Sequence, residues 1–190
     1  MEIEIRAFIE DIDGIKAKLD VIGAKYYSKE RIIDYWFCEK DKGKFEQVQQ
    51  NAPGSYGLRV RQSEKEGKNI FELNCKVLKK EGDHNAFHEF ETKIDNFEQT
   101  KKILESIGFK IFCTLDKIRI TYSFDRCKIN IEDIKGFKPA VELEIISDEH
   151  VEENKAFLRE LLDKLGIDPK NRIEKSITYL YMKEFAFKQV

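Results

Sequence analysis

Two short acidic motifs lie far apart in the chain, and each alternates glutamate with an apolar residue. Glu2 and Glu4 flank Ile3, and Glu142 and Glu144 flank Leu143. Because side chains of a β-strand alternate between its two faces, each glutamate pair would share one face of a sheet. Paired carboxylates supply the hard oxygen ligands that Mg²⁺ and Mn²⁺ prefer. The two motifs therefore fit either a divalent-metal site or an ordinary solvated face.

Basic residues alternate in the same way on other segments. Arg59 and Arg61 lie in "LRVR", Lys117 and Arg119 lie in "KIRI", and Arg6 follows the first acidic pair. Lysine and arginine donate hydrogen bonds to phosphate oxygens, and arginine often donates two at once. A cavity with both kinds of residue would suit a metal–polyphosphate complex. The alternative is an ordinary solvated face, which is the usual role of charged residues.

The segments that carry these residues have the pattern of strands, and helices separate some of them. Helices are expected over 11–22, 96–107 and 149–165, because apolar residues recur there at helical spacing and a glycine follows each segment. Besides the opening segment, strands are expected over 31–38, 57–62, 70–78, 87–94, 117–124, 127–134 and 140–146. Residues 39–56 are predicted to form a mobile loop. Residues 175–187 fit either a strand or a helix.

Each of the eight expected strands has one ionic face and one apolar face, and two architectures satisfy this pattern. An open antiparallel sheet would turn its ionic face to water and cover its apolar face with the helices. An eight-stranded barrel would instead hold the ionic face inside, around one small ligand. That interior would have to be hydrated and built to hold ions, because an unpaired buried charge is strongly destabilising.

Composition limits the other classes of function. The net charge is −2 although 37% of the residues are charged, so no nucleic-acid-binding surface is indicated. Apolar runs are too short for a membrane span. The four cysteines are far apart and form no CxxC pair, which favours reduced thiols in a cytoplasmic protein and disfavours a zinc site. With no linker-like stretch, residues 1–190 are predicted to form a single domain.

Taken in order, these motifs resemble those of the CYTH superfamily, the triphosphate tunnel metalloenzymes. Glu2-x-Glu4-x-Arg6 is similar to the family's ExExK signature, and "LRVR" at 58–61 is similar to its LRxR strand. In 129–145 an acidic residue, Glu132, is followed ten positions later by ExE, as in the family. The other matching segments are "DYWF" at 34–37, Lys76, "HEFE" at 88–91 and "DKIRITY" at 116–122. The resemblance extends to about residue 181.

The resemblance implies a fold and a set of site residues. The fold would be α+β, an eight-stranded antiparallel β-barrel that forms a tunnel, with helices packed outside. The implied ligands of Mg²⁺ or Mn²⁺ are Glu2, Glu4, Glu132, Glu142 and Glu144. The implied triphosphate-binding residues are Arg6, Arg59, Arg61, Lys76, Lys117 and Arg119. Lys76 and Glu132 are also the expected catalytic residues.

Several positions depart from the family pattern. Arg6 stands where lysine is usual, so a compact donor is replaced by a planar one. Glu132 stands where aspartate is usual, which moves the carboxylate outward by one methylene. Lys138 stands where a second glycine is common, and Ile177 where a tyrosine is often found.

The overall length, and a start directly at the first strand, look most like the class IV adenylate cyclase branch, which converts ATP to cyclic AMP and pyrophosphate. One alternative is a triphosphatase that hydrolyses thiamine triphosphate, inorganic triphosphate or a nucleotide. Another is a non-catalytic module that binds polyphosphate or nucleotide. The expected partner is a small-molecule triphosphate in the cytoplasm, with no nucleic acid and no membrane, and a homodimer is allowed for.

Overall fold

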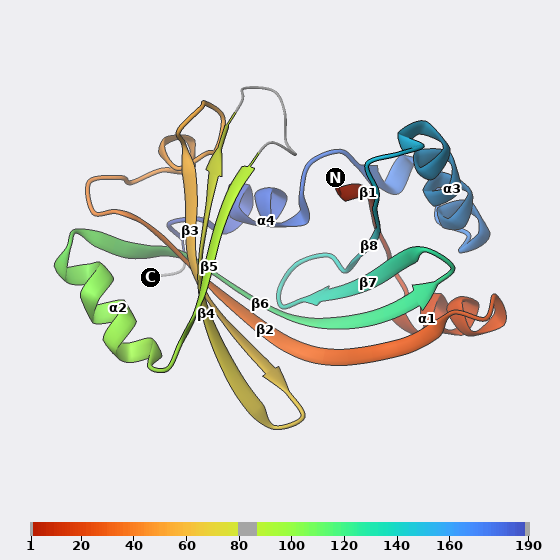
Figure 1. Ribbon diagram of the computed structural model, residues 1–190, viewed down its shortest axis with the longest axis horizontal. Helices are drawn as coiled ribbons and strands as arrows, with labels where there is room; N and C mark the ends of the chain where they lie inside the picture. The colour runs from red at the N-terminus through yellow and green to blue at the C-terminus, as the bar shows by residue number, and fades with distance from the viewer. Residues whose placement is uncertain (1, 80–86, 189–190) are drawn as a thin grey trace. The chain divides into compact units, whose positions relative to one another are not determined.

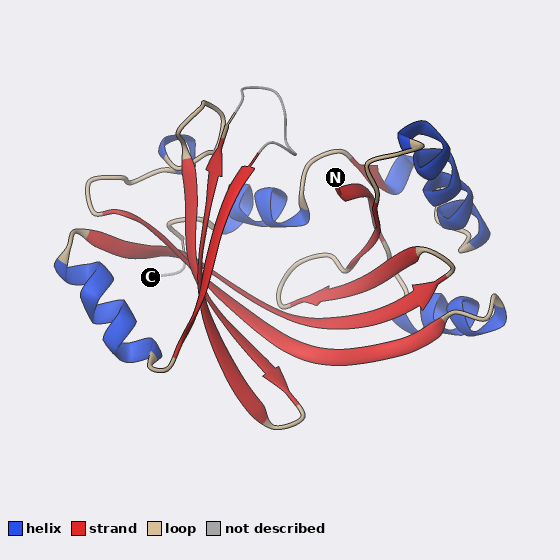
Figure 2. Cartoon of the chain, in the orientation of Figure 1, coloured by secondary structure: helices blue, strands red, loops and turns tan. Residues whose placement is uncertain are grey.

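The computed structural model describes residues 2–79 and 87–188 (Figures 1 and 2). Within these residues, nine strands form one antiparallel sheet in the order β5-β4-β3-β2-β6-β7-β8-β1-β9. The strands are β1 (Glu2–Phe8), β2 (Lys25–Glu39), β3 (Tyr56–Lys65), β4 (Lys68–Leu78), β5 (Phe87–Ile94), β6 (Phe109–Phe124), β7 (Cys127–Ile134), β8 (Ala140–Ile146) and β9 (Arg172–Ile173). The α-helices are α1 (Ile12–Val21), α2 (Phe97–Ser106), α3 (Val151–Lys164) and α4 (Ile177–Phe185).

The predicted α+β antiparallel fold is confirmed, with differences in detail. The two-residue strand β9 adds to the eight expected strands, and β2 and β6 begin earlier than predicted. The ambiguous C-terminal stretch is helical: Ile177, Tyr181, Met182 and Ala186 are its buried residues, a spacing that suits a helix and not a strand. The predicted loop includes a short 3₁₀ helix, η1 (Phe45–Gln47).

The chain divides into two compact units, and β2 and β6 contribute to both. The first unit runs from the N-terminus to Glu30 and continues with Lys117–Ile177. The second unit comprises Arg31–Asp116 and Thr178–Val190.

The first unit buries the apolar face of β1, β7 and β8 against two helices. Ile129 and Leu143 are fully buried, and they share one core with Leu19 of α1 and Leu158 of α3. Figure 1 shows α3 beside β1 and β8. Helix α1 begins at a capping residue, Asp11, whose Oδ1 accepts a hydrogen bond from the Gly14 N–H at 2.9 Å. With the apolar residues in this core, the charged residues of the same strands lie on the opposite face.

The second unit repeats this division with helix α2. Phe37, Val60 and Leu104 are buried together, and Leu58 and Phe97 pack against them. Helix α2 begins at Asn96, whose Oδ1 accepts a hydrogen bond from the Gln99 N–H at 3.0 Å. The alternate residues of β2, β3 and β4 therefore present their charged side chains away from α2.

The sequence led us to expect no membrane-spanning segment and no paired cysteines. No helix in the described part of the chain is long and apolar enough to cross a membrane. All four cysteines are free thiols, and three of them, Cys38, Cys113 and Cys127, are buried.

Candidate functional site: two charged sheet faces

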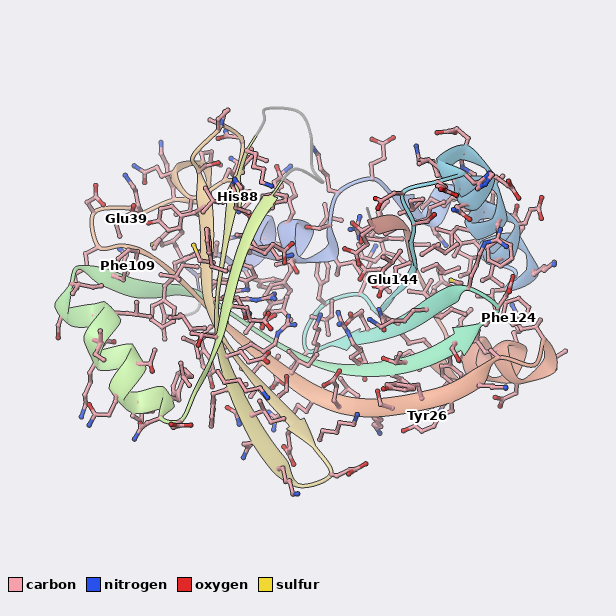
Figure 3. The ribbon with its side chains drawn as sticks, in the orientation of Figure 1. Tyr26, Glu39, His88, Phe109, Phe124 and Glu144 are labelled. Carbon is pink, nitrogen blue, oxygen red and sulfur yellow. The ribbon has the colours of Figure 1, made fainter. Side chains whose placement is uncertain are left out.

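The acidic motifs of the first unit lie on neighbouring strands. Strands β1 and β8 are antiparallel, with Glu4 opposite Glu144 and Arg6 opposite Glu142, whereas Glu2 lies opposite Ile146. Figure 3 labels Glu144 on β8. Side chains directly opposite each other in such a pair have Cβ atoms about 5 Å apart. The carboxylates of Glu4 and Glu144 are therefore close enough to reach the same ion.

Most of these carboxylates contact a cation of the protein. Arg6 forms an ion pair with Glu4, and its Nε donates to Glu142 Oε2 at 2.6 Å. Lys128 Nζ donates to Glu144 Oε1 at 2.7 Å, and Asn130 Nδ2 lies 3.3 Å from Glu144 Oε2. Glu2 is exposed at the start of β1. The register thus brings Arg6 to the acidic residues that the sequence assigns to a metal.

The chemistry of these donors suits a hard divalent cation, but their side chains are arranged around cations of the protein. Among residues 2–79 and 87–188, no three His, Cys, Asp or Glu side chains are placed to hold a metal ion together. To bind a metal ion, these carboxylates would have to release their present partners: Glu4 and Glu142 would release Arg6, and Glu144 would release Lys128. Glutamate side chains turn readily about their own bonds, so the residues fit the role of metal ligands. The metal assignment stays a prediction.

Glu132 of β7 is placed differently from the other glutamates. It is 1% exposed and lies opposite Arg119 of β6. Its Oε1 accepts hydrogen bonds from Arg119 Nε at 2.8 Å and Nη2 at 2.5 Å, and its Oε2 lies 3.0 Å from Lys117 Nζ. Burial by itself raises the pKa of Glu132, but the charges and hydrogen bonds of Lys117 and Arg119 outweigh burial and hold the pKa below its ordinary value.

The polar residues beside this group are also paired. Thr121 Oγ1 donates to Asn130 Oδ1 at 3.0 Å, and both residues are buried. Asn130 in turn contacts Glu144. A connected set of charged and polar side chains therefore covers this face of β6, β7 and β8, where a simple solvated face would leave the side chains exposed.

The charged face of the second unit is organised around Asp34 of β2. Asp34 is 1% exposed and lies opposite Arg61 of β3. Arg61 donates from Nε to Asp34 Oδ1 at 2.7 Å and from Nη2 to Oδ2 at 2.8 Å. Arg59 Nη1 lies 3.5 Å from Asp34 Oδ2, and its guanidinium lies over the Trp36 ring, 5.3 Å from the centroid. The arginines are thus held by a carboxylate and an indole.

Lys76, an expected catalytic residue, lies on β4 of the second unit. Its Nζ donates to Glu89 Oε1 of β5 at 2.8 Å, and both side chains are exposed. Nearby, Arg59 Nε donates to Asn74 Oδ1 at 3.2 Å, and Asn74 Nδ2 donates to Glu91 Oε2 at 2.6 Å. Exposed pairs of this kind contribute little to stability, so Lys76 is readily available to another anion.

The structure therefore groups the predicted residues by unit. Arg6, Lys117 and Arg119 share the first unit with all five predicted metal ligands, and Arg59, Arg61 and Lys76 share the second. Sequence reasoning assigned no role to Asp34, Lys128, Asn130 and Asn74, which the structure places in direct contact with predicted site residues. Alternation placed these residues on the ionic faces, but only the strand register reveals their partners.

The fold and these charged faces define an α+β protein whose antiparallel sheet carries alternating acidic and basic residues. A model of the CYTH domain matches residues 1–177, and the chain therefore belongs to the CYTH family. A candidate adenylate cyclase of Methanocaldococcus jannaschii is 28% identical over 178 residues, which cover 93% of this chain and 95% of that protein. The predicted family resemblance is confirmed.

Solved structures from several organisms share the fold. The PH1819 protein of Pyrococcus horikoshii has a TM-score of 0.74 at 21% identity, covering 96% of this chain and 99% of that chain. A candidate adenylate cyclase of Vibrio parahaemolyticus has a TM-score of 0.69 at 17% identity, covering 94% and 97% of the respective chains. The HpAC1 protein of Hippeastrum, described as having a dominant triphosphatase activity, has a TM-score of 0.65 at 16% identity, covering 95% of both chains.

Proposed function

We propose that this protein is a divalent-metal-dependent enzyme that acts on a triphosphate, and that its reaction is the class IV adenylate cyclase reaction. The observation that carries the proposal is the β1–β8 register, which sets Glu4 opposite Glu144 and Arg6 opposite Glu142. Acidic residues able to share a metal are thereby combined with a phosphate-binding cation on one sheet face. Membership of the CYTH family, and the candidate adenylate cyclase of M. jannaschii, support the same class of reaction.

In this proposal Glu2, Glu4, Glu142 and Glu144 hold Mg²⁺ or Mn²⁺. Neutralisation of charge along the phosphate chain is the chemistry that the bound ion supplies. Arg6, Lys117 and Arg119 of the first unit donate hydrogen bonds to phosphate oxygens. The same role is proposed separately for Arg59, Arg61 and Lys76 of the second unit. Catalysis then consists largely of positioning and charge stabilisation.

The cyclase reaction forms a bond between the ribose 3′-oxygen and the α-phosphorus of ATP. The bond from the α-phosphorus to the oxygen that bridges it to the β-phosphate breaks, the 3′-hydroxyl loses its proton, and pyrophosphate leaves. If a water molecule instead attacks the γ-phosphorus, the bond from that phosphorus to the oxygen that bridges it to the β-phosphate breaks, and the same residues support hydrolysis to orthophosphate and a diphosphate. The activity described for the Hippeastrum protein favours this triphosphatase reaction as the second candidate.

The experiment that tests the proposal is one reaction series with ATP, thiamine triphosphate and inorganic triphosphate. Each is incubated with Mg²⁺, with Mn²⁺ and with EDTA, and the products are resolved by chromatography. We expect cyclic AMP and pyrophosphate from ATP, only in the presence of metal. Orthophosphate with a diphosphate would replace the cyclase assignment by a triphosphatase. Absence of turnover on all three substrates, with triphosphate binding retained, would show a binding module.

A matched pair of variants tests the metal ligands in the same series. Glu144→Gln keeps the size of the side chain but removes the charge that a divalent ion needs, so turnover should fall by about a hundredfold or more. Glu160→Gln, an exposed glutamate of α3, is the control and should retain full activity. Wild-type turnover in Glu144→Gln would remove this residue from the metal set.

A further inference from the structure

The two units hold their basic residues by the same arrangement. In the second unit, Asp34 lies directly opposite Arg61 and also reaches Arg59, the cation two residues earlier on β3. Cross-strand pairs are direct neighbours, and the residue two positions along is the next on the same face. One carboxylate therefore holds two successive cations of the neighbouring strand.

Glu132 has the same relation to β6 in the first unit. It lies directly opposite Arg119 and reaches Lys117, again the cation two residues earlier on the neighbouring strand. Its side chain is 2% exposed, and that of Asp34 is 1% exposed. The two carboxylates thus match in register, in burial and in the position of their two cations.

The contacts of Glu132 differ from those of the glutamates in the ExE motifs. Both of its carboxylate oxygens lie within 3.0 Å of a cationic nitrogen, one oxygen beside Arg119 and the other beside Lys117. Glu142 and Glu144 have side chains that are 16% and 10% exposed, and they form ion pairs with Arg6 and Lys128 respectively. A carboxylate that is buried between two cations is costly to draw away, because each cation would then lose its counter-charge.

We infer that Glu132 is the counterpart of Asp34, a positioning residue that orients Lys117 and Arg119 toward phosphate and not a ligand of the metal. The inference rests on the proposed function, in which these cations contact the triphosphate. Long basic side chains lose rotamer freedom when they bind an anion. A buried carboxylate that already fixes them removes this cost from binding and places their remaining N–H groups in advance. The metal set is then Glu2, Glu4, Glu142 and Glu144.

The test separates anion binding from metal binding in the full-length protein. Calorimetry measures the affinity for inorganic triphosphate in EDTA, and electron paramagnetic resonance measures Mn²⁺ binding without phosphate. Glu132→Asp and Asp34→Glu keep the charge but move the carboxylate by one methylene. Both should weaken triphosphate binding by roughly ten- to a hundredfold, as is typical when supporting contacts of a site are displaced.

Mn²⁺ binding provides the contrasting measurement. Glu132→Gln keeps the size of the side chain and should bind Mn²⁺ within about threefold of wild type, whereas Glu144→Gln should lose at least about tenfold. Circular dichroism checks that each variant is folded, and Asp34→Glu carries the triphosphate measurement if Glu132→Asp fails to fold. A loss of Mn²⁺ affinity in Glu132→Gln equal to that in Glu144→Gln would overturn the inference.

The remaining outcomes distinguish the inference from the proposed function. If wild type binds triphosphate and the charge-conserving variants bind it equally well, the positioning role is wrong while the proposed function stands. If wild type binds no triphosphate, with or without Mn²⁺, the proposed function fails and the inference falls with it.

Discussion

At the scale of single residues, a buried charge is stable here only because its partners are supplied by the neighbouring strand. Glu132 lies between Lys117 and Arg119, and those cations keep its pKa low in spite of burial. Burial in turn opposes the charge of Arg119, but Glu132 outweighs that effect and raises the pKa of Arg119. Each group is thus charged because the other is present, and removal of either leaves an uncompensated charge.

Glu132→Gln should therefore lower the free energy of unfolding at pH 7, by about 3 kcal/mol for a broken buried ion pair. The pKa of Glu132 is lower in the folded protein than in the unfolded chain, where it is about 4.3. Its stabilising contribution is therefore fully present above that value and is lost as the pH falls through the folded-state pKa. The difference in Tm between wild type and Glu132→Gln should therefore become smaller as the pH is lowered from 5 to 3, as followed by circular dichroism.

Glu152→Gln is the control for this measurement. Glu152 is exposed on α3, and its pKa is lowered by a hydrogen bond from Lys155 and by that residue's charge. Its replacement should leave the Tm nearly unchanged at every pH, since exposed pairs contribute little. A Tm difference for Glu132→Gln that stays constant down to pH 3 would show that the carboxylate is not the stabilising group.

At the scale of elements, helices position the strands without contributing to the charged faces. Helix α2 packs Phe97 and Leu104 on the side of the second unit where Leu58 and Val60 lie. The charged residues alternate with these apolar residues along β3, so Arg59 and Arg61 point to the other side. Stability of α2 and anion binding by the arginines should therefore be separable.

Removal of the N-terminal cap of α2 tests this separation. Asn96→Ala deletes the acceptor of the Gln99 N–H and should lower the free energy of unfolding by about 1 kcal/mol, measured by urea denaturation. Asn96→Asp retains an acceptor and should restore most of this loss. Triphosphate affinity should be equal in all three proteins, and a weaker affinity in Asn96→Ala would show that α2 supports the arginines.

At the scale of the whole molecule, the thiols report how tightly the chain is packed. Burial raises the pKa of Cys38 to about 11 and of Cys113 and Cys127 to about 12. Burial also raises the pKa of Cys75, whose side chain is only partly covered. Because the thiolate is the reactive form, the three buried cysteines should react only slowly in the native protein.

Thiol titration with a chromogenic disulfide tests this expectation. In native protein at pH 8, Cys75 should react first and the three buried thiols much more slowly, since roughly one in a thousand or fewer of their thiols is ionised. In denaturant all four cysteines should react at once. Rapid reaction of two or more thiols in the native protein would contradict the packing described here.

Much of the fold follows from local sequence patterns. Alternation placed Ile3, Ile129 and Leu143 in the core and the glutamates of the ExE motifs on the other face, because side chains along a strand must alternate. The three predicted helices end just before Gly23, Gly108 and Gly166, and each glycine has a positive φ that other residues rarely adopt. Both rules depend only on residues a few positions apart, so the sequence alone is enough to apply them.

The partners of the charged residues depended on the tertiary structure. Alternation shows that Asp34 and Glu132 lie on ionic faces, but the sequence does not state which cation lies opposite each carboxylate. That is set by the register of β2 with β3 and of β6 with β7, and a shift by one residue would turn every side chain to the other face. The helical form of the C-terminal stretch was likewise decided by packing, because its apolar pattern fits both a strand and a helix. Residue types therefore determined which chemistry this protein could support, whereas long-range pairing determined which groups meet, since a carboxylate's neighbours come from strands distant in the chain.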